Sequence, residues 1–303
     1  MNARSPGDER TCAVRRAQPW LGTLVDISAH ANCQHALTEG VAEAFAAIAR
    51  IHHALSSHDA DSELTRVNRR AALTKQAISK ELRAVLACAL ALAASSDGAF
   101  DPTVGGELVA LGILPPLARH DRGATWRDVT LDEEGVEFER PLVLDLNGIA
   151  KGYAVDCAIA ALRNAGVTRA CVNAGGDLRV FGSANETVYV RTGGAQSVML
   201  PLITIAEGAV ATSAYGHQRR RIRGRMATPL IEPRGRFPSM TTRTITVAAP
   251  TCMIADALTK VVALKGKRAG SVLAGYGASA AILSPAKGRW RCARVPCIAG
   301  NNG

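Results

Sequence analysis

Two glycine-containing turns on either side of a helix-like segment, between residues 142 and 182, constrain the fold more than any other feature of this chain. The apolar run 142–144 predicts a buried strand that ends at Asp145. Apolar residues at helical spacing follow, and they predict a helix over about 153–164 that ends before Gly166. A second short strand is expected to end in the sequence Asn-Ala-Gly-Gly-Asp at 173–177. The chain is therefore expected to run strand, turn, helix, strand and turn here.

The first of these turns carries Lys151 just before the predicted helix. A lysine beside the free backbone N–H groups of a helix N-terminus is an arrangement that binds anions such as phosphates. Gly175 and Gly176 in the second turn allow a ligand to approach the backbone closely. The pattern is neither the G-x-G-x-x-G fingerprint nor the Walker A loop. It indicates a nucleotide site of another kind.

The remaining segments predict helices and strands that alternate irregularly. Strands are expected at 20–29, 187–199 and 244–249, with hairpins inside 126–144 and up to residue 294. Helices are expected at 36–55 with a start near Asn32, from Ser79 or Lys80 to Ala94, and at 254–264, with a short helix or loop at 105–117. These elements predict an α+β protein with a mainly antiparallel sheet core and packed helices.

The 303 residues, 48% of them hydrophobic, are enough to bury one large core or two intimately packed lobes. We expect a single domain over 19–298, preceded by a disordered basic arm at 1–18 and followed by a tail at 299–303. No apolar run is long enough to predict a membrane span, and the polar N-terminal segment lacks the apolar core of a signal peptide. The chain as written is expected to be cytoplasmic, whereas a mis-assigned start would allow a periplasmic location.

Basic residues give the chain a formal net charge of +10, and many of them lie in the segment 217–225. Aromatic side chains are not interleaved there, so the stacking pattern of single-strand nucleic-acid binders is missing and no nucleic-acid partner is expected. Two interpretations remain: a solvated basic loop, or a rim that attracts an anionic ligand or an acidic protein.

Several further short motifs occur in a fixed order along most of the chain. They are Leu-Gly-Thr at 21–23, Asp-Ser-Glu-Leu at 61–64 with Asn68, Gly-Ala-Phe-Asp-Pro-Thr-Val at 98–104, Ala-Thr-Ser at 211–213 and Ala-Asp-Ala-Leu-Thr-Lys at 255–260. Together with the segment 145–182, this ordered set resembles the ApbE family of FAD:protein FMN transferases. The resemblance implies an antiparallel-sheet architecture related to the T-fold.

The same resemblance implies an activity. Members of this family move FMN from FAD to a threonine or serine hydroxyl of an acceptor redox protein with an FMN-binding domain, release AMP and use Mg²⁺. Two alternatives stay open for this chain: a FAD-binding carrier that has no transfer activity, and a FAD pyrophosphatase in which water replaces the hydroxyl. The sequence leaves the oligomeric state open.

The resemblance also assigns roles to residues of this chain. Lys151 and Asp256 are expected catalytic residues, as is Lys260, which departs from the family pattern, and Asp177 is expected to help shape the pocket floor. The residues expected to contact FAD are Leu21, His58, Ala99, Phe100, Asp101, Asp145, Lys151, Asn173, Gly175, Gly176, Thr212 and Ser213.

The expected metal ligands are the carbonyl of Gly148 and the carboxylate of Asp256, both of which suit Mg²⁺. The family's other side-chain ligand is a threonine four residues after the aspartate, but here that position is Lys260 and Thr259 lies one residue early. Two hypotheses follow. Either Gly148, Asp256 and water hold Mg²⁺, or the ammonium of Lys260 pairs with Asp256 one helical turn away and replaces the metal.

Two other positions depart from the family pattern. Ala214 stands where the glycine of a Thr-Ser-Gly motif is usual. Pro229 stands where a histidine of a His-x-x-Asp-Pro segment is usual, while Glu232 keeps the carboxylate. His217 is either a substitute for that histidine or an ordinary surface residue.

Overall fold

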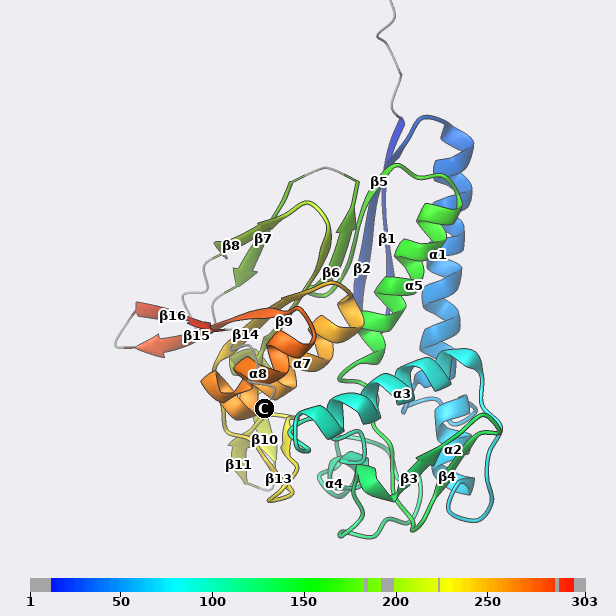
Figure 1. Ribbon diagram of the computed structural model, residues 1–303, viewed down its shortest axis with the longest axis vertical. Coiled ribbons are helices and arrows are strands. Elements are labelled where there is room, and N and C mark those ends of the chain that lie inside the picture. The colour runs from blue at the N-terminus through cyan, green and yellow to red at the C-terminus, as the bar shows by residue number, and fades with distance from the viewer. Residues whose placement is uncertain (1–11, 183–184, 192–198, 223, 287–288, 297–303) are drawn as a thin grey trace, which may run out of the picture.

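An eight-stranded antiparallel sheet forms the centre of the protein (Figure 1). The computed structural model describes residues 12–182, 185–191, 199–222, 224–286 and 289–296. In spatial order the strands are β1 (Cys12–Trp20), β2 (Thr23–Ala31), β5 (Arg169–Ala174), β6 (Asp177–Phe181), β9 (Gly208–Ala214), β14 (Thr244–Ala249), β15 (Ser279–Ala286) and β16 (Arg289–Val295). Every neighbouring pair is antiparallel, which confirms the predicted α+β class.

Three helices pack against one another and against this sheet: α1 (Gln34–Leu55), α5 (Ala150–Asn164) and α7 (Cys252–Lys265). Because side chains alternate along a strand, β6 has two different faces. Asp177 and Arg179 bond to side chains of α5, whereas Leu178 and Val180 join a separate apolar cluster with the hairpin β7 (Glu186–Arg191) and β8 (Met199–Ile205). The alternation in β6 thus places an acidic side chain at the helix layer.

A second group of elements lies around one end of α1 (Figure 1). It comprises α2 (Glu63–Arg70), α3 (Lys80–Ser95), α4 (Gly105–Ala110), the 3₁₀ turn η1 (Trp126–Asp128), β3 (Val129–Leu131) and β4 (Val136–Phe138). The side chain of Asn68 in α2 bonds both the N–H and the C=O of Leu144, so it ties this group to the segment before α5. One apolar core runs through both groups, and their division into two lobes stays a prediction.

The segment between β9 and β14 forms short elements, and a helical region follows α7. They are α6 (Tyr215–Gln218), β10 (Arg220–Ile222), β11 (Arg225–Ala227), β12 (Ile231–Glu232), β13 (Phe237–Pro238), η2 (Gly266–Ala269) and α8 (Gly270–Gly275). Among the described residues, no helix is both long and apolar enough to cross a membrane.

Most predicted helices and hairpins are confirmed. Helix α1 extends two residues before the predicted span, and α3 begins after Ser79, whose hydroxyl caps the N–H of Leu82. Helix α5 begins at Ala150, so Lys151 lies in its first turn rather than before it. The hairpins β3–β4 and β15–β16 are present where turns were expected.

Three predictions for the first half of the chain, at 1–18, 20–29 and 142–144, are wrong in part. Residues 12–18 are not a disordered arm, because they form β1 and pair with β2; residues 1–11 and the predicted tail at 299–303 lie outside the described residues. The strand expected at 20–29 is instead the end of one strand and most of another, joined by Leu21 and Gly22. Both have positive φ, as the tight two-residue turn of a hairpin requires.

The run 142–144 is buried but makes only one isolated bridge, from Val143 to Val104, so it is not a strand of a sheet. Its apolar side chains fill the core, and burial alone cannot distinguish such a segment from a strand. The strand expected at 187–199 corresponds to the described β7 and the start of β8, with 192–198 outside the described residues.

Helices α5 and α7 approach so closely at Gly152 that a larger residue does not fit. A Cβ at Gly152 would lie 2.2 Å from the carbonyl oxygen of Cys252. We therefore expect Gly152→Ala to lower the free energy of unfolding by about 1–3 kcal/mol, measured by urea denaturation. Gly275→Ala is the control, because no atom lies within 4 Å of the Cβ it would add. Equal stability of the two variants would show that the helices can separate freely.

Candidate active site

Four charged side chains meet where α5, α7 and β6 come together. Lys151 of α5 forms an ion pair with Asp177 of β6, and Lys260 forms one with Asp256 on the same face of α7. The two pairs are linked, since Nζ of Lys151 lies 4.0 Å from Oδ2 of Asp256. The carboxylates are almost completely buried, with side chains of Asp177 and Asp256 2% and 1% exposed. The cluster contains two positive and two negative charges.

Neighbouring charges shift the pKa values of Lys151 and Asp256 in the directions that keep both groups charged. Burial opposes the charge of Asp256, but Lys151, Lys260 and the N–H of Gly152 outweigh it and lower the pKa of this carboxyl. Burial also opposes the charge of Lys151, yet the nearby carboxylates raise the pKa of this ammonium above its ordinary value. For Asp177, burial and the charge of Asp256 dominate, so its pKa is raised.

A cavity of about 490 Å³ opens above this cluster. Its polar lining includes Lys151, Lys260, Asp145 and Arg220, whereas another part is apolar. The apolar part comprises Phe100, Val104, Leu108, Ile113, Leu114, Leu230 and Ile231. A cavity with cations at one side and aliphatic side chains at another suits a ligand that carries both phosphate and ring systems.

A second cavity of about 430 Å³ adjoins the first. His58, Asn147 and Lys151 line both, so the two spaces meet around these residues. The second cavity reaches the β1–β2 turn at Leu21 and the C-terminal end of α1 at Leu55. Together they provide two compartments that share Lys151 in their linings.

The structure brings most of the predicted site residues together. Those that line the first cavity are His58, Ala99, Phe100, Asp101, Asp145, Gly148, Lys151, Gly175, Thr212, Ser213 and Lys260. Leu21 lines the second cavity. Asp256 lies beneath the floor and reaches the cavity through its two lysine partners.

Asn173 and Gly176 are outside both linings. The Oδ1 atom of Asn173 accepts the N–H of Gly176 at 2.9 Å, so this side chain holds the β5–β6 turn. Gly175 in the same turn does line the cavity, and a Cβ there would lie 2.5 Å from the hydroxyl of Thr23. Ligand contact by Asn173 and Gly176 stays a prediction.

Two of the acidic residues in the lining are held by their own loops. Asp101 Oδ1 accepts the N–H and the hydroxyl of Thr103 at 2.8 and 2.6 Å. Asp145 Oδ1 accepts the backbone N–H and side-chain N–H of Asn147 at 3.2 and 2.6 Å. Burial raises the pKa of both carboxyls above the usual value, while these hydrogen bonds partly offset it. These hydrogen bonds therefore fix the conformation of both turns at the cavity wall before a ligand binds.

The hydroxyl of Thr259 does not bond to the carboxylate of Asp256. It lies 2.8 Å from the hydroxyl of Ser213 and donates to the backbone carbonyl of Asp256 at 2.7 Å. Thr259 thus connects α7 to β9, whereas Lys260 reaches the Asp256 carboxylate.

Several lining residues were not predicted from the sequence. Tyr215 is 2% exposed and lines the first cavity, and its buried hydroxyl lies near the hydroxyls of Ser213 and Thr259 without forming a hydrogen bond of normal geometry. Asn147, Gln218 and Arg220 also line it. The pairing of Asp177 with Lys151 was missed as well, although the charge next to the Gly-Gly turn was visible in the sequence.

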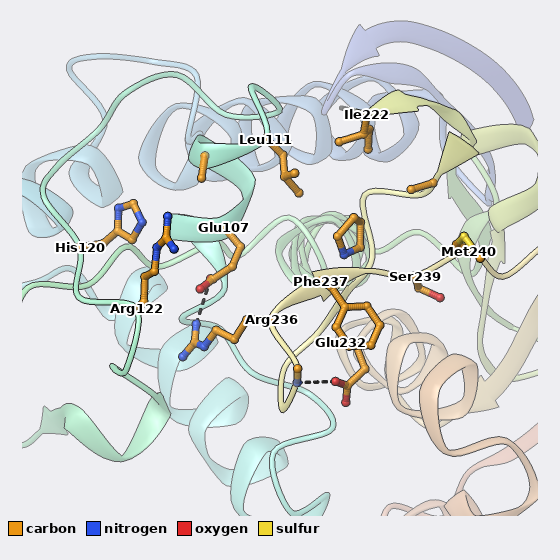
Figure 2. Close-up of a pocket in the computed structure, with 14 residues that line it drawn as sticks. Glu107, Leu111, His120, Arg122, Ile222, Glu232, Arg236, Phe237, Ser239 and Met240 are labelled. Atoms are coloured by element: carbon orange, nitrogen blue, oxygen red, sulfur yellow. Dashed lines mark hydrogen bonds and ion pairs between the residues drawn. The ribbon is translucent and has the colours of Figure 1, made fainter. Parts of the chain in front are cut away.

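A third cavity, of about 850 Å³, is lined by Glu232 of β12, whereas Ile231 of the same strand lines the first cavity (Figure 2 shows the third cavity). Arg236 there is largely buried and ion-paired to Glu107 at 2.9 Å, so its charge is already balanced. Glu232 lines this cavity and accepts the N–H of Gly235 at 2.5 Å. None of the residues predicted to contact FAD lines it. The first two cavities are therefore the candidate site.

The positions that depart from the family pattern lie in different places. Pro229 lines the first cavity, whereas Glu232 faces the third. His217 lies in α6, is exposed and lines neither compartment of the candidate site. Its suggested role as a substitute base stays a prediction.

Fold and cavity together define an α+β protein with a two-compartment site that presents two lysines to its ligand. The ApbE family model matches residues 21–283. The chain therefore belongs to the ApbE family.

Individual relatives agree with this assignment. The FAD:protein FMN transferase of Vibrio cholerae is 28% identical over 243 residues, which cover 74% of this chain and 72% of that protein. The solved structure of the flavin transferase ApbE from Vibrio cholerae matches with a TM-score of 0.80 at 22% identity, covering 95% of this chain and 98% of that one. The apo flavinyl transferase ApbE of Pseudomonas stutzeri also gives 0.80, at 20% identity, covering 95% and 96%. These two structures show the fold.

Proposed function

We propose that this protein transfers FMN from FAD to a threonine or serine hydroxyl of an acceptor redox protein and releases AMP. Membership of the ApbE family and the similarity to FAD:protein FMN transferases support the proposal. The observation that carries it for this chain is the pair of lysines, Lys151 and Lys260, at the polar side of a cavity whose other side is apolar. A dinucleotide with a diphosphate between two ring systems has this distribution of charge.

In the proposed reaction, the acceptor hydroxyl oxygen bonds to the phosphorus of the FMN half. The bond from that phosphorus to the bridging oxygen breaks, AMP leaves with the bridging oxygen, and the hydroxyl proton passes to solvent. Negative charge grows on the bridging oxygen, and cations held beside it lower the barrier. Lys151 and Lys260 supply these cations, and Asp177 and Asp256 hold their ammonium groups in place.

The two compartments give the ring systems separate places. Lys151 lines both, so a diphosphate beside it would have one half of the dinucleotide in each compartment. The apolar wall formed by Leu108, Leu114 and Leu230 would exclude water from one ring. Arg220, an exposed residue that lines the same cavity, adds a further positive charge for an anionic ligand.

The proposal is tested by incubating the protein with FAD and a generic FMN-binding acceptor domain. AMP release and acceptor mass are measured together. AMP with an acceptor that has gained one FMN supports transfer. FMN and AMP with an unchanged acceptor would instead indicate FAD hydrolysis, and bound but intact FAD would indicate a carrier.

The buried hydroxyl of Tyr215 provides a prediction within this function. This hydroxyl has only loose contacts with the hydroxyls of Ser213 and Thr259, so Tyr215→Phe should change the free energy of unfolding by less than about 1 kcal/mol. A hydrogen bond from this hydroxyl to bound FAD would be lost, which should weaken FAD binding about tenfold by calorimetry.

Tyr276→Phe is the matched control, because that hydroxyl already bonds Ser95 and lines neither compartment. The control should lose a little stability and keep its FAD affinity. A destabilised Tyr215→Phe with unchanged affinity would contradict a ligand contact at this hydroxyl.

A further inference from the structure

The side chain of Lys260 lies between the two residues that were expected to hold Mg²⁺. Its Nζ atom is ion-paired to Oδ1 of Asp256 and donates to the backbone carbonyl of the same residue at 3.0 Å. Its side chain also packs on Gly148, where a Cβ would lie 3.2 Å from Cε of Lys260. A side chain that carries a positive charge thus occupies the space between Gly148 and Asp256.

The oxygen atoms left around this point do not fit a divalent cation. Mg²⁺ binds carboxylate oxygens at about 2.0–2.1 Å, so an ion on Oδ1 of Asp256 would occupy the place of the Lys260 ammonium. The other oxygen, Oδ2, accepts the N–H of Gly152 at 3.3 Å and faces Lys151. The hydroxyl of Thr259 is engaged with Ser213. Within the described part of the chain, no three His, Cys, Asp or Glu side chains gather as a metal site.

The ammonium group has the chemistry to replace the ion. It carries three N–H donors, and two of them are directed at the side chain and backbone of Asp256. Lys260 lines the first cavity, and its side chain is 20% exposed, so the third donor is available to a ligand oxygen. Lys151 lies on the other side of Asp256 and supplies a second cation at the same floor.

We propose that Lys260 replaces a divalent cation in this protein, so that it binds the diphosphate of FAD and acts on it without a metal. The proposal rests on the proposed function for the identity of the ligand. The carboxylate of Asp256 then holds an ammonium group instead of coordinating Mg²⁺. The FAD affinity of the unmodified protein should therefore not depend on metal. Removal of the ammonium should open a site beside Asp256 that a divalent cation can bind.

FAD binding is measured by calorimetry in the presence of a chelator and in excess Mg²⁺, for the unmodified protein, Lys260→Thr and Lys260→Arg. The unmodified protein and Lys260→Arg should bind FAD equally well in both conditions, within about twofold. Lys260→Thr should bind about tenfold or more weakly in chelator and recover when Mg²⁺ is added. Lys267→Thr, at an exposed lysine after α7, is the control and should behave like the unmodified protein.

Binding of Mn²⁺ alone, followed by its electron paramagnetic resonance signal, tests the inference without FAD. Lys260→Thr should bind the ion at this site and the unmodified protein should not.

The inference would be overturned if the unmodified protein bound Mn²⁺ tightly and Asp256→Asn removed that binding. FAD binding that needs Mg²⁺ would also overturn it, and either result would leave flavin transfer intact. Failure of the unmodified protein to bind FAD in either condition would contradict the proposed function instead. Lys260→Arg keeps the comparison decisive if Lys260→Thr does not fold, because loss of FAD binding in chelator by Lys260→Arg would also overturn it.

Discussion

Asp256→Asn should lower the free energy of unfolding by about 3–5 kcal/mol, the usual effect of removing one partner from a buried ion pair. The Asp256 side chain is 1% exposed and lies between Lys151 and Lys260. Its replacement leaves two ammonium groups with only the carboxylate of Asp177, so the cluster gains a net positive charge at the largely buried floor of the cavity. Urea denaturation of the purified variant measures the loss.

A second substitution separates this charge effect from simple loss of packing. Asp256→Asn combined with Lys260→Met restores neutrality, because Lys151 and Asp177 remain as one pair. The double variant should therefore be more stable than Asp256→Asn alone, with an interaction energy of about 1–3 kcal/mol between the two sites. A double variant whose loss equals the sum of the single losses would show that the two residues do not act as a pair.

The local spacing of residues was enough to predict part of the site. Asp256 and Lys260 are four residues apart, and this spacing places them on one face of a helix whichever fold surrounds it. The lysine at the start of α5 and the Gly-Gly turn after β5 were predicted for the same reason, since each depends on a few neighbouring residues. The motif order along the chain supplied the rest of the expected lining.

Contacts between distant segments could not be predicted in this way. Asp177 meets Lys151 because β6 places its odd-numbered residues toward α5, and this orientation depends on the register of β5, β6 and β9. Tyr215 lines the cavity because the chain turns into α6 directly after β9, where Ala214 stands in place of the usual glycine. Strand β1 was missed because most of its side chains are exposed, so its sequence lacks the apolar alternation that marks a half-buried strand.

The charge balance of the cluster explains why its members act together. Lys151 and Lys260 are each held by a buried carboxylate, and Asp256 contacts both ammonium groups. An anionic ligand that enters the cavity therefore meets two cations whose positions are already set, so these two side chains do not have to be ordered when it binds. The buried acids serve the ligand indirectly, through the lysines that they position.

Lys151→Met should reduce the rate of FMN transfer by about 10²–10³, the effect typical of removing one preorganised group that stabilises charge in a transition state. Lys151 lines both compartments, so it is the cation nearest to the place where a bridging diphosphate would lie. The rate is measured as AMP release with saturating FAD and acceptor. Lys75→Met is the matched control, because Lys75 is also ion-paired, to Asp132 and Glu134 in the turn of the β3–β4 hairpin, but lines neither compartment.

Removal of Lys151 also leaves Asp177 buried without its partner, and this could lower activity by unfolding the protein. The pKa of Asp177 is already raised by burial and by Asp256, so its carboxyl should take up a proton in the variant and limit the damage. Lys151→Met combined with Asp177→Asn removes the buried charge altogether. This double variant should be more stable than Lys151→Met and yet remain as slow in transfer, because the missing cation, and not the fold, limits the rate. Recovery of transfer in the double variant would show that Lys151 serves stability alone.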